Sequence, residues 1–233
     1  MEIQRVWEHN GSDSILYASS LVGAFTRGET KNIALQKMAR EAASYLEWKG
    51  EAVPHSLEPV IVQEKASALM ISDADTDVLF EDEKKPLSAE EYEGAKALAL
   101  RSAQDFLALY EAVPDKNKNC LPVRKTFYGQ VPRTASEMYE HTKNVNDYYF
   151  GEIGVGADHE GTIVECRRRG FALLESRPDF LKNTVYLGSY GEEWSLRKVL
   201  RRFIWHDRIH AKAMYRMAVR TFGGNIPNVF HFV

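Results

Sequence analysis

The chain has 233 residues, of which 44% are hydrophobic and 27% charged, with a formal net charge of −3, ordinary values for a globular protein that folds unaided. No apolar run approaches the roughly 20 residues that span a bilayer, and the N-terminal residues lack the apolar core of a signal peptide, so we expect a soluble, cytoplasmic protein without a membrane partner. The two cysteines, Cys120 and Cys166, are too few and too far apart for a disulfide framework or a cysteine-only metal site.

The N-terminal region predicts a small sheet with one helix. Three short runs are rich in β-prone side chains: SILYASSL at 14–21, GAFTR at 23–27 and VIVQEKA at 60–66. Between the second and third runs, a helical pattern begins after Thr30, a good N-cap, and stops at Gly50. We expect residues 1–70 to form a small α+β domain of the β-β-β-α-β type.

The stretch GAFTRGETKNIALQKMAREAASYLEWKGE resembles the HicB-like antitoxin domain, whose strand, Gly-x-Thr turn and long helix it follows in order. The resemblance covers residues 1–66. It implies a small α/β module from a family whose members often pair with an RNA-cleaving toxin and are often fused to a DNA-binding helix-turn-helix or ribbon. We find neither fusion here. The alternative is a module for packing or dimerisation, and we expect homo-oligomerisation through this domain because the strands leave edges that must be covered.

An acidic segment follows. Residues 1–114 carry 11 basic and 20 acidic side chains, whereas residues 115–233 carry 19 basic and 13 acidic ones. Much of the acid lies in ISDADTDVLFEDEKKP, which has no clean helical or strand period and ends in a proline. We expect residues 71–87 to form an acidic linker. The alternative is a solvated edge of one continuous domain.

After this segment the apolar spacing becomes helical, and four helices are predicted. The first begins at Ser88 with a capping box and ends near Pro114, and the second begins at Thr134 with Glu137 as its capping-box partner and runs to about Gly154. The third, over 161–181, is weakened by Gly170 and Pro178. The fourth has an N-cap at Ser195 and stops at Gly223-Gly224. We expect an all-α, up-down four-helix bundle over residues 88–233.

Three histidines lie on the inward stripes of these helices. His206 and His210 are four residues apart within the stripe of the fourth helix, so their side chains share one face. His141 lies on the stripe of the second helix. A bundle would bring the three imidazoles together around one cation and leave a fourth coordination position open, the pattern of a catalytic zinc site. The alternative for the pair is a set of hydrogen-bonded core histidines. We expect the remaining histidines at the surface: His9, His55, His159 and His231.

The segments SEMYEHTKNVNDYYFGEI and EEWSLRKVLRRFIWHDRIHAKAMYRM are similar to the corresponding parts of the DinB-like (YfiT-type) family of four-helix bundles. The resemblance covers residues 88–233. It implies a divalent metal, commonly zinc or nickel, with His141, His206 and His210 as ligands. It also implies chemistry of the kind some members perform, thiol transfer or thiol-dependent isomerisation with a low-molecular-weight thiol.

The expected site has two further candidates. Glu137, one turn before His141, is the best candidate for a general base or a partner of a metal ligand, although its place in the capping box gives it an equally good structural role. Arg202, one turn before His206, is a candidate for binding an anionic ligand or cofactor, but the interpretation that we favour is a solvated arginine.

The sequence therefore favours a metal-dependent enzyme, a hydrolase or a thiol S-transferase acting on a small-molecule substrate. The alternative is a non-catalytic HicB-like antitoxin or regulatory protein whose bundle is stabilised by metal. The basic run Arg167-Arg168-Arg169 lacks interleaved aromatic residues, so we interpret it as a solvated basic face and do not expect a nucleic-acid partner.

Overall fold

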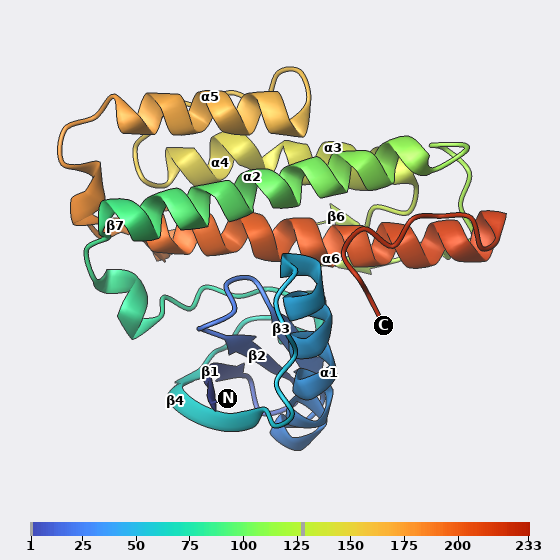
Figure 1. Ribbon diagram of the computed structural model, residues 1–233, viewed down its shortest axis with the longest axis horizontal. Coiled ribbons are helices and arrows are strands. Elements are labelled where there is room, and N and C mark those ends of the chain that lie inside the picture. Colours follow the sequence, from blue (N-terminus) through green and yellow to red (C-terminus); the bar gives the residue numbers. More distant parts are fainter. Residues whose placement is uncertain (1, 127–128) are drawn as a thin grey trace. The chain divides into compact units, whose positions relative to one another are not determined.

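The computed structural model describes residues 2–126 and 129–233 (Figure 1). The chain divides into two compact units, Met1–Lys84 together with Phe230–Val233, and Lys85–Val229. The first unit holds a small sheet and the second is mostly helical, so the expected α+β layout is confirmed. None of the helices among the described residues combines the length and apolar character that a membrane span requires.

The sheet of the first unit has the strand order β3-β2-β1-β4. Its strands are β1 (Glu2–His9), β2 (Ser14–Ala18), β3 (Phe25–Gly28) and β4 (Glu58–Ala66). Strands β1, β2 and β3 pair antiparallel through short turns, whereas β4 pairs parallel to β1. A parallel pair needs a crossover connection, and α1 (Lys31–Lys49) provides it. The element order is therefore β-β-β-α-β, as expected.

Helix α1 begins and ends where the sequence predicts. The Thr30 hydroxyl accepts a hydrogen bond from the Ile33 N–H, and Gly50 ends the helix at a φ of 76°, a left-handed conformation that glycine adopts without strain. The buried face of α1 includes Trp48, whose ring centroid lies 5.3 Å from that of Phe230. The last four residues therefore pack in the first unit, and the expected helical domain over 88–233 ends before them.

The expected acidic linker over 71–87 is largely part of the first unit. It contains two short 3-10 helices, η1 (Ile71–Asp73) and η2 (Glu81–Lys84), and it buries Ile71, Val78, Leu79 and Phe80. The Phe80 ring packs 5.4 Å from that of Tyr17, and the side-chain amide of Gln63 donates a hydrogen bond to the Leu79 carbonyl. The segment was expected to be an exposed linker because most of its side chains are acidic or polar, and the few apolar residues among them did not indicate burial.

The second unit is built on five α-helices among its described residues: α2 (Ala89–Ala112), α3 (Ala135–Lys143), α4 (Val145–Gly151), α5 (Ile163–Glu175) and α6 (Leu196–Phe222). Helix α2 packs against α3, α5 and α6, and α6 also contacts α3 and α4 (Figure 1). The helix expected over 134–154 is divided at Asn144 into α3 and α4. The expected capping boxes at Ser88 and Thr134 are present.

Short elements complete the second unit. They are two small hairpins, β5 (Lys125–Thr126) with β6 (Gly129–Gln130) and β7 (Tyr186–Leu187) with β8 (Glu193–Trp194), and the 3-10 helices η3 (Phe180–Lys182) and η4 (Ser189–Gly191). Helix α5 is shorter than expected and ends at Glu175, before Pro178.

A buried ion pair joins three helices of the second unit. The guanidinium of Arg167 on α5 donates two hydrogen bonds to the carboxylate of Asp207 on α6, at 2.6 and 3.1 Å, and one to the Ala99 carbonyl on α2. Both side chains are fully buried. The basic run 167–169 is thus not a uniform solvated face, because its first arginine lies in the core while Arg168 and Arg169 are exposed.

Gly170 is required by packing rather than merely tolerated in α5. A Cβ built on this residue would lie 2.2 Å from the Phe150 ring, which is fully buried and packs against the rings of Phe171 and Phe203. We expect Gly170→Ala to lower the free energy of unfolding, because overpacking costs about 1–3 kcal/mol and the gain in helix propensity, about 1 kcal/mol, offsets only part of this. Urea unfolding measures the change.

The matched control is Gly94→Ala in α2, where an added Cβ would have no atom within 4 Å. This variant is expected to gain up to about 1 kcal/mol of stability from helix propensity alone. Equal gains in both variants would show that the Phe150 ring does not constrain position 170.

Candidate metal centre

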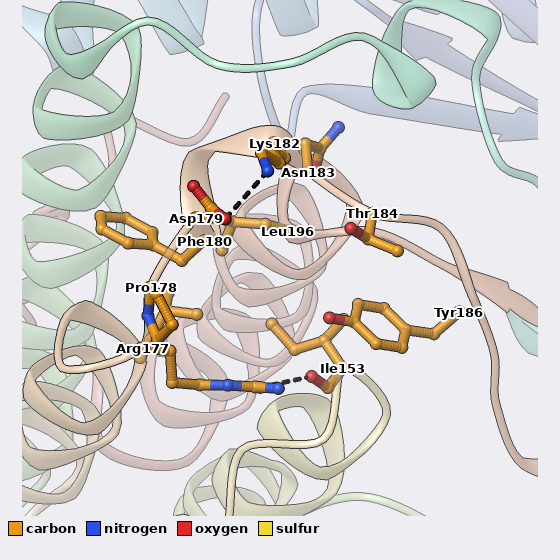
Figure 2. Close-up of a pocket in the computed structure, with 11 residues that line it drawn as sticks. Ile153, Arg177, Pro178, Asp179, Phe180, Lys182, Asn183, Thr184, Tyr186 and Leu196 are labelled. Carbon is orange, nitrogen blue, oxygen red and sulfur yellow. Dashed lines mark hydrogen bonds and ion pairs between the residues drawn. The ribbon is translucent and has the colours of Figure 1, made fainter.

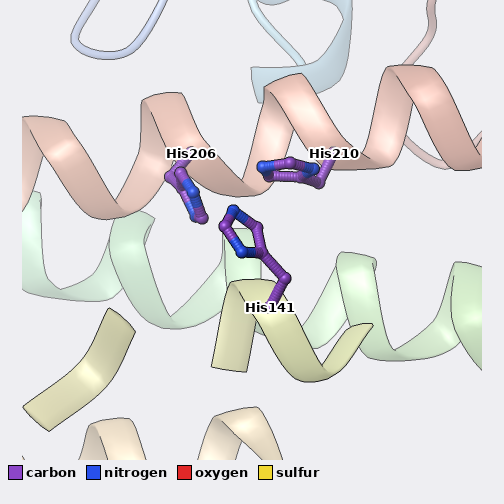
Figure 3. A group of neighbouring side chains, drawn as sticks. All are labelled: His141, His206 and His210. Carbon is purple, nitrogen blue, oxygen red and sulfur yellow. The ribbon is translucent and has the colours of Figure 1, made fainter. Parts of the chain in front are cut away.

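Three histidines converge in the second unit. His141 comes from α3, and His206 and His210 come from successive turns of α6 (Figure 3). The ring centroids lie 5.1 Å apart for His141 and His206, 4.6 Å for His141 and His210, and 4.5 Å for His206 and His210. One nitrogen from each ring can be chosen so that all three lie within 4.8 Å of one another.

Local sequence places these rings. Residues four apart on a helix lie one above the other, so the spacing of His206 and His210 fixes both rings on the face of α6 that contacts α3. The capping box of Thr134 and Glu137 sets the start of α3 two turns before His141. Because α3 is short, the position of its start determines where the His141 ring points.

The surroundings of the three rings favour neutral imidazole. His206 is buried, and His141 and His210 are half-buried. Burial lowers the pKa of His141, and burial together with the nearby His141 lowers the pKa of His210 to about 3. The pKa of His206 falls well below its usual value, first because of burial and then because the other two rings and Arg202 disfavour a further positive charge. All three rings are therefore neutral at pH 7, the protonation state in which histidine binds metals.

One nitrogen of the His206 ring has no hydrogen-bond partner among the described residues. The Nδ1 atom of His206 is buried and forms no hydrogen bond with any described residue. A buried polar atom without a partner costs about 1–3 kcal/mol, so such atoms in native proteins call for a ligand, a water molecule or a proton-bearing neighbour. Three neutral imidazoles, one with an unpaired buried nitrogen, fit the donor set that zinc and nickel prefer.

Glu137 forms the capping box of α3, the structural role expected for it. Its carboxylate accepts hydrogen bonds from the backbone N–H groups of Arg133, at 2.7 Å, and Thr134, at 3.0 Å. These backbone donors lower the pKa of Glu137, which makes the carboxylate a weaker base. The arrangement stabilises the start of α3 and leaves Glu137 poorly suited to accept a proton at neutral pH.

Arg202 is not solvated. Its side chain is buried, and its guanidinium lies 3.2 Å from the Glu192 carboxylate and 5.0 Å from the centroid of the Trp205 ring. The same Glu192 oxygen lies 2.9 Å from the ammonium of the buried Lys198. The expected solvated arginine is therefore wrong. The anion that Arg202 contacts is a carboxylate of its own chain.

The neighbours of the histidines include residues that the sequence analysis did not select. The ring of Tyr149 on α4 lies edge-on to His206, with centroids 6.0 Å apart, and also contacts Trp194 and Phe203. Burial raises the pKa of Tyr149 to about 12. The contact arises where α4 packs against α6, after the second expected helix has been divided at Asn144. The spacing of residues along that helix did not indicate it.

The other histidines lie apart from this group. His9 is half-buried and contacts Glu64 at 3.2 Å, and His159 contacts Asp147 at 3.0 Å. His55 and His231 are exposed, as expected. Among the described residues, His141, His206 and His210 form the single cluster with the spacing of metal ligands.

Comparisons with known proteins bring no match: no protein-family model, no curated protein and no solved structure matches the chain. The resemblances to the DinB-like and HicB-like families therefore rest on the motifs of this sequence alone.

Proposed function

We propose that His141, His206 and His210 bind one divalent metal ion, zinc or nickel, and leave a coordination position open. The observation that carries this proposal is the convergence of three neutral imidazoles that are buried or half-buried. One of them has a buried nitrogen with no hydrogen-bond partner among the described residues. His141 and His210 are half-buried rather than buried, so the cluster is not wholly enclosed by the protein. The proposal includes the up-down four-helix bundle of the DinB-like type, with α3 and α4 together as its second helix.

The donor set indicates the chemistry. A divalent cation held by uncharged ligands keeps its full charge, lowers the pKa of a bound water or thiol and polarises a carbonyl. The protein's part is to hold the three rings neutral, which burial does for all three and the nearby Arg202 cation does for His206. This combination supports a metal-dependent hydrolase or a thiol S-transferase that uses a low-molecular-weight thiol.

The metal assignment predicts the result of a ligand deletion. The purified protein, grown with zinc and nickel, is expected to carry about one equivalent of metal per chain, and the double variant His206→Ala/His210→Ala less than about a tenth of that. The reason is that a single remaining imidazole does not hold a divalent ion against buffer and water. Elemental analysis of the purified proteins measures the ratio, and circular dichroism verifies that the variant is folded.

The matched control is His159→Ala, which removes a histidine outside the cluster and is expected to leave the metal content unchanged. A full equivalent in the double variant, or metal-free wild-type protein after growth with both metals, would show that the three are core histidines. Ester hydrolysis and transfer of a small thiol to an aryl halide are then assayed with the metal-bound protein. Metal binding without turnover in either assay would favour the alternative, a metal-stabilised regulatory protein.

The first unit is proposed to serve association rather than catalysis, either with a second copy of the chain or with a toxin of the kind the HicB-like resemblance implies. Two features support this. Strand β4 is an outer strand of the sheet, and Val60 and Val62 on it are exposed.

A further inference from the structure

The helical unit contains a cavity that does not include the three histidines. It has a volume of about 290 Å³ and opens between the turn after α5, the segment leading to β7 and the first residue of α6 (Figure 2). The lining residues include Ile153, Leu174, Arg177, Thr184, Tyr186 and Leu196. This volume lies just below the range of about 300–1,000 Å³ that small-molecule sites occupy.

Several side chains that line the cavity have hydrogen-bond donors with no partner among the described residues. The guanidinium of Arg177 is oriented by one hydrogen bond, from Nη1 to the Ile153 carbonyl at 2.8 Å. Its remaining nitrogens, the Thr184 hydroxyl and the Tyr186 hydroxyl have no hydrogen-bond partner among the described residues. Figure 2 shows the phenol oxygen of Tyr186 pointing toward the middle of the lining residues and the guanidinium of Arg177 below it in this view. An anchored arginine with free donors is a typical binding group for carboxylates and phosphates.

The rest of the lining limits the charge and size of a ligand. Lys182 is paired with Asp179 at 2.8 Å, so these two charges offset each other and Arg177 leaves a net charge of +1. Leu174, Leu196 and Ile153 form apolar walls. A monoanion with an apolar body fits both features, whereas a phosphate dianion would leave one charge unpaired and the apolar walls uncovered.

We propose that this cavity binds a small organic carboxylate, with the carboxylate on Arg177, Thr184 and Tyr186 and the apolar body against Leu174, Leu196 and Ile153. The cavity is separate from the metal centre. Leu196 precedes His206 by ten residues of α6, which corresponds to about 15 Å along a helix axis.

The test follows a small carboxylate by fluorine NMR. Fluorobenzoate is titrated into full-length protein treated with a chelator, because a carboxylate also binds an open metal position. We expect a dissociation constant of about 1 mM or below, and no comparable binding of the neutral fluorobenzamide. Arg177→Met is expected to weaken binding at least tenfold, about the effect of losing a charged hydrogen bond.

Arg168→Met is the matched control, since it removes the same charge from an exposed position on α5 outside the cavity and is expected to change nothing. Tyr186→Phe and Thr184→Val remove hydroxyls that bond no described residue, so they keep the fold and are expected to weaken binding by about threefold to tenfold. They decide the question if Arg177→Met fails to fold.

Several outcomes would overturn the proposal: no binding of fluorobenzoate, equal affinity in Arg177→Met and Arg168→Met, or displacement by inorganic phosphate at lower concentration than by acetate, which would make this a phosphate site. Loss of binding in chelator-treated His206→Ala/His210→Ala would place the carboxylate at the histidines instead. The metal assignment is tested by metal content and stands or falls separately.

Discussion

Asp207→Ala is expected to lower the free energy of unfolding by about 3–5 kcal/mol, because it leaves the Arg167 guanidinium buried without its counter-charge. Both side chains of this pair are fully buried, and Arg167 also bonds the Ala99 carbonyl, so α2, α5 and α6 lose a shared anchor together. Urea unfolding followed by circular dichroism measures the loss. Few single substitutions in this chain are expected to cost more.

A double substitution separates the cost of an unpaired charge from the value of the pair. Arg167→Met/Asp207→Leu replaces both charges by apolar side chains of similar size, and we expect it to be more stable than Asp207→Ala alone. Its metal content is expected to equal that of the wild type, because neither residue belongs to the histidine cluster. A double variant as unstable as the single one would mean that the ion pair contributes net stability.

The sequence carries most of the information about the candidate site. The four-residue spacing of His206 and His210 and the inward position of His141 depend only on helical periodicity, which long amphipathic helices follow closely. The capping residues Ser88, Thr134 and Ser195 also predicted the helix starts correctly, because each supplies a side-chain oxygen to an otherwise unpaired N–H.

The buried charges were out of reach of such patterns. Arg167 and Asp207 belong to strongly polar stretches, and only the packing of α5 against α6 shows that they meet in the core. Arg202 likewise pairs with Glu192, a residue before the helix that no spacing rule connects to it. The segment over 71–84 buries four apolar residues, but its many acidic residues indicated an exposed linker. The first unit was therefore expected to end at residue 70, whereas it extends to Lys84.

A buried carboxyl group that contacts the segment over 71–84 gives the second large expected effect, which is on the free energy of unfolding. Glu8 on β1 is fully buried, it accepts a hydrogen bond from the Thr76 hydroxyl, and the Asp77 carboxylate lies close enough to raise its pKa. Burial is the main cause that raises the pKa of Glu8, Asp77 adds to it, the Thr76 hydrogen bond and the Lys65 charge oppose it, and the net pKa is about 7. The folded protein therefore holds a proton on Glu8 that the unfolded chain releases near pH 4.5.

The sign of the pH dependence follows from that difference. Because the folded state binds the proton more tightly, the stabilisation is fully present below about pH 4.5 and is lost as the pH rises through about 7. Glu8→Gln keeps an acceptor for Thr76, adds an N–H donor and has no charge to bury, so above pH 7 it is expected to be more stable than the wild type by up to about 3 kcal/mol. Below pH 4.5 this advantage is expected to disappear.

The measurement is the difference in urea unfolding free energy between wild type and variant across this pH range. Taking the difference cancels the contribution of the three histidines, whose lowered pKa values act in the opposite direction by destabilising the protein as the pH falls below 6.5. Glu58→Gln, at an exposed position on β4, is the control and is expected to give a difference that does not vary with pH. A constant difference for Glu8→Gln as well would mean that Glu8 is ionised in the folded protein, with Lys65 rather than a proton balancing its charge.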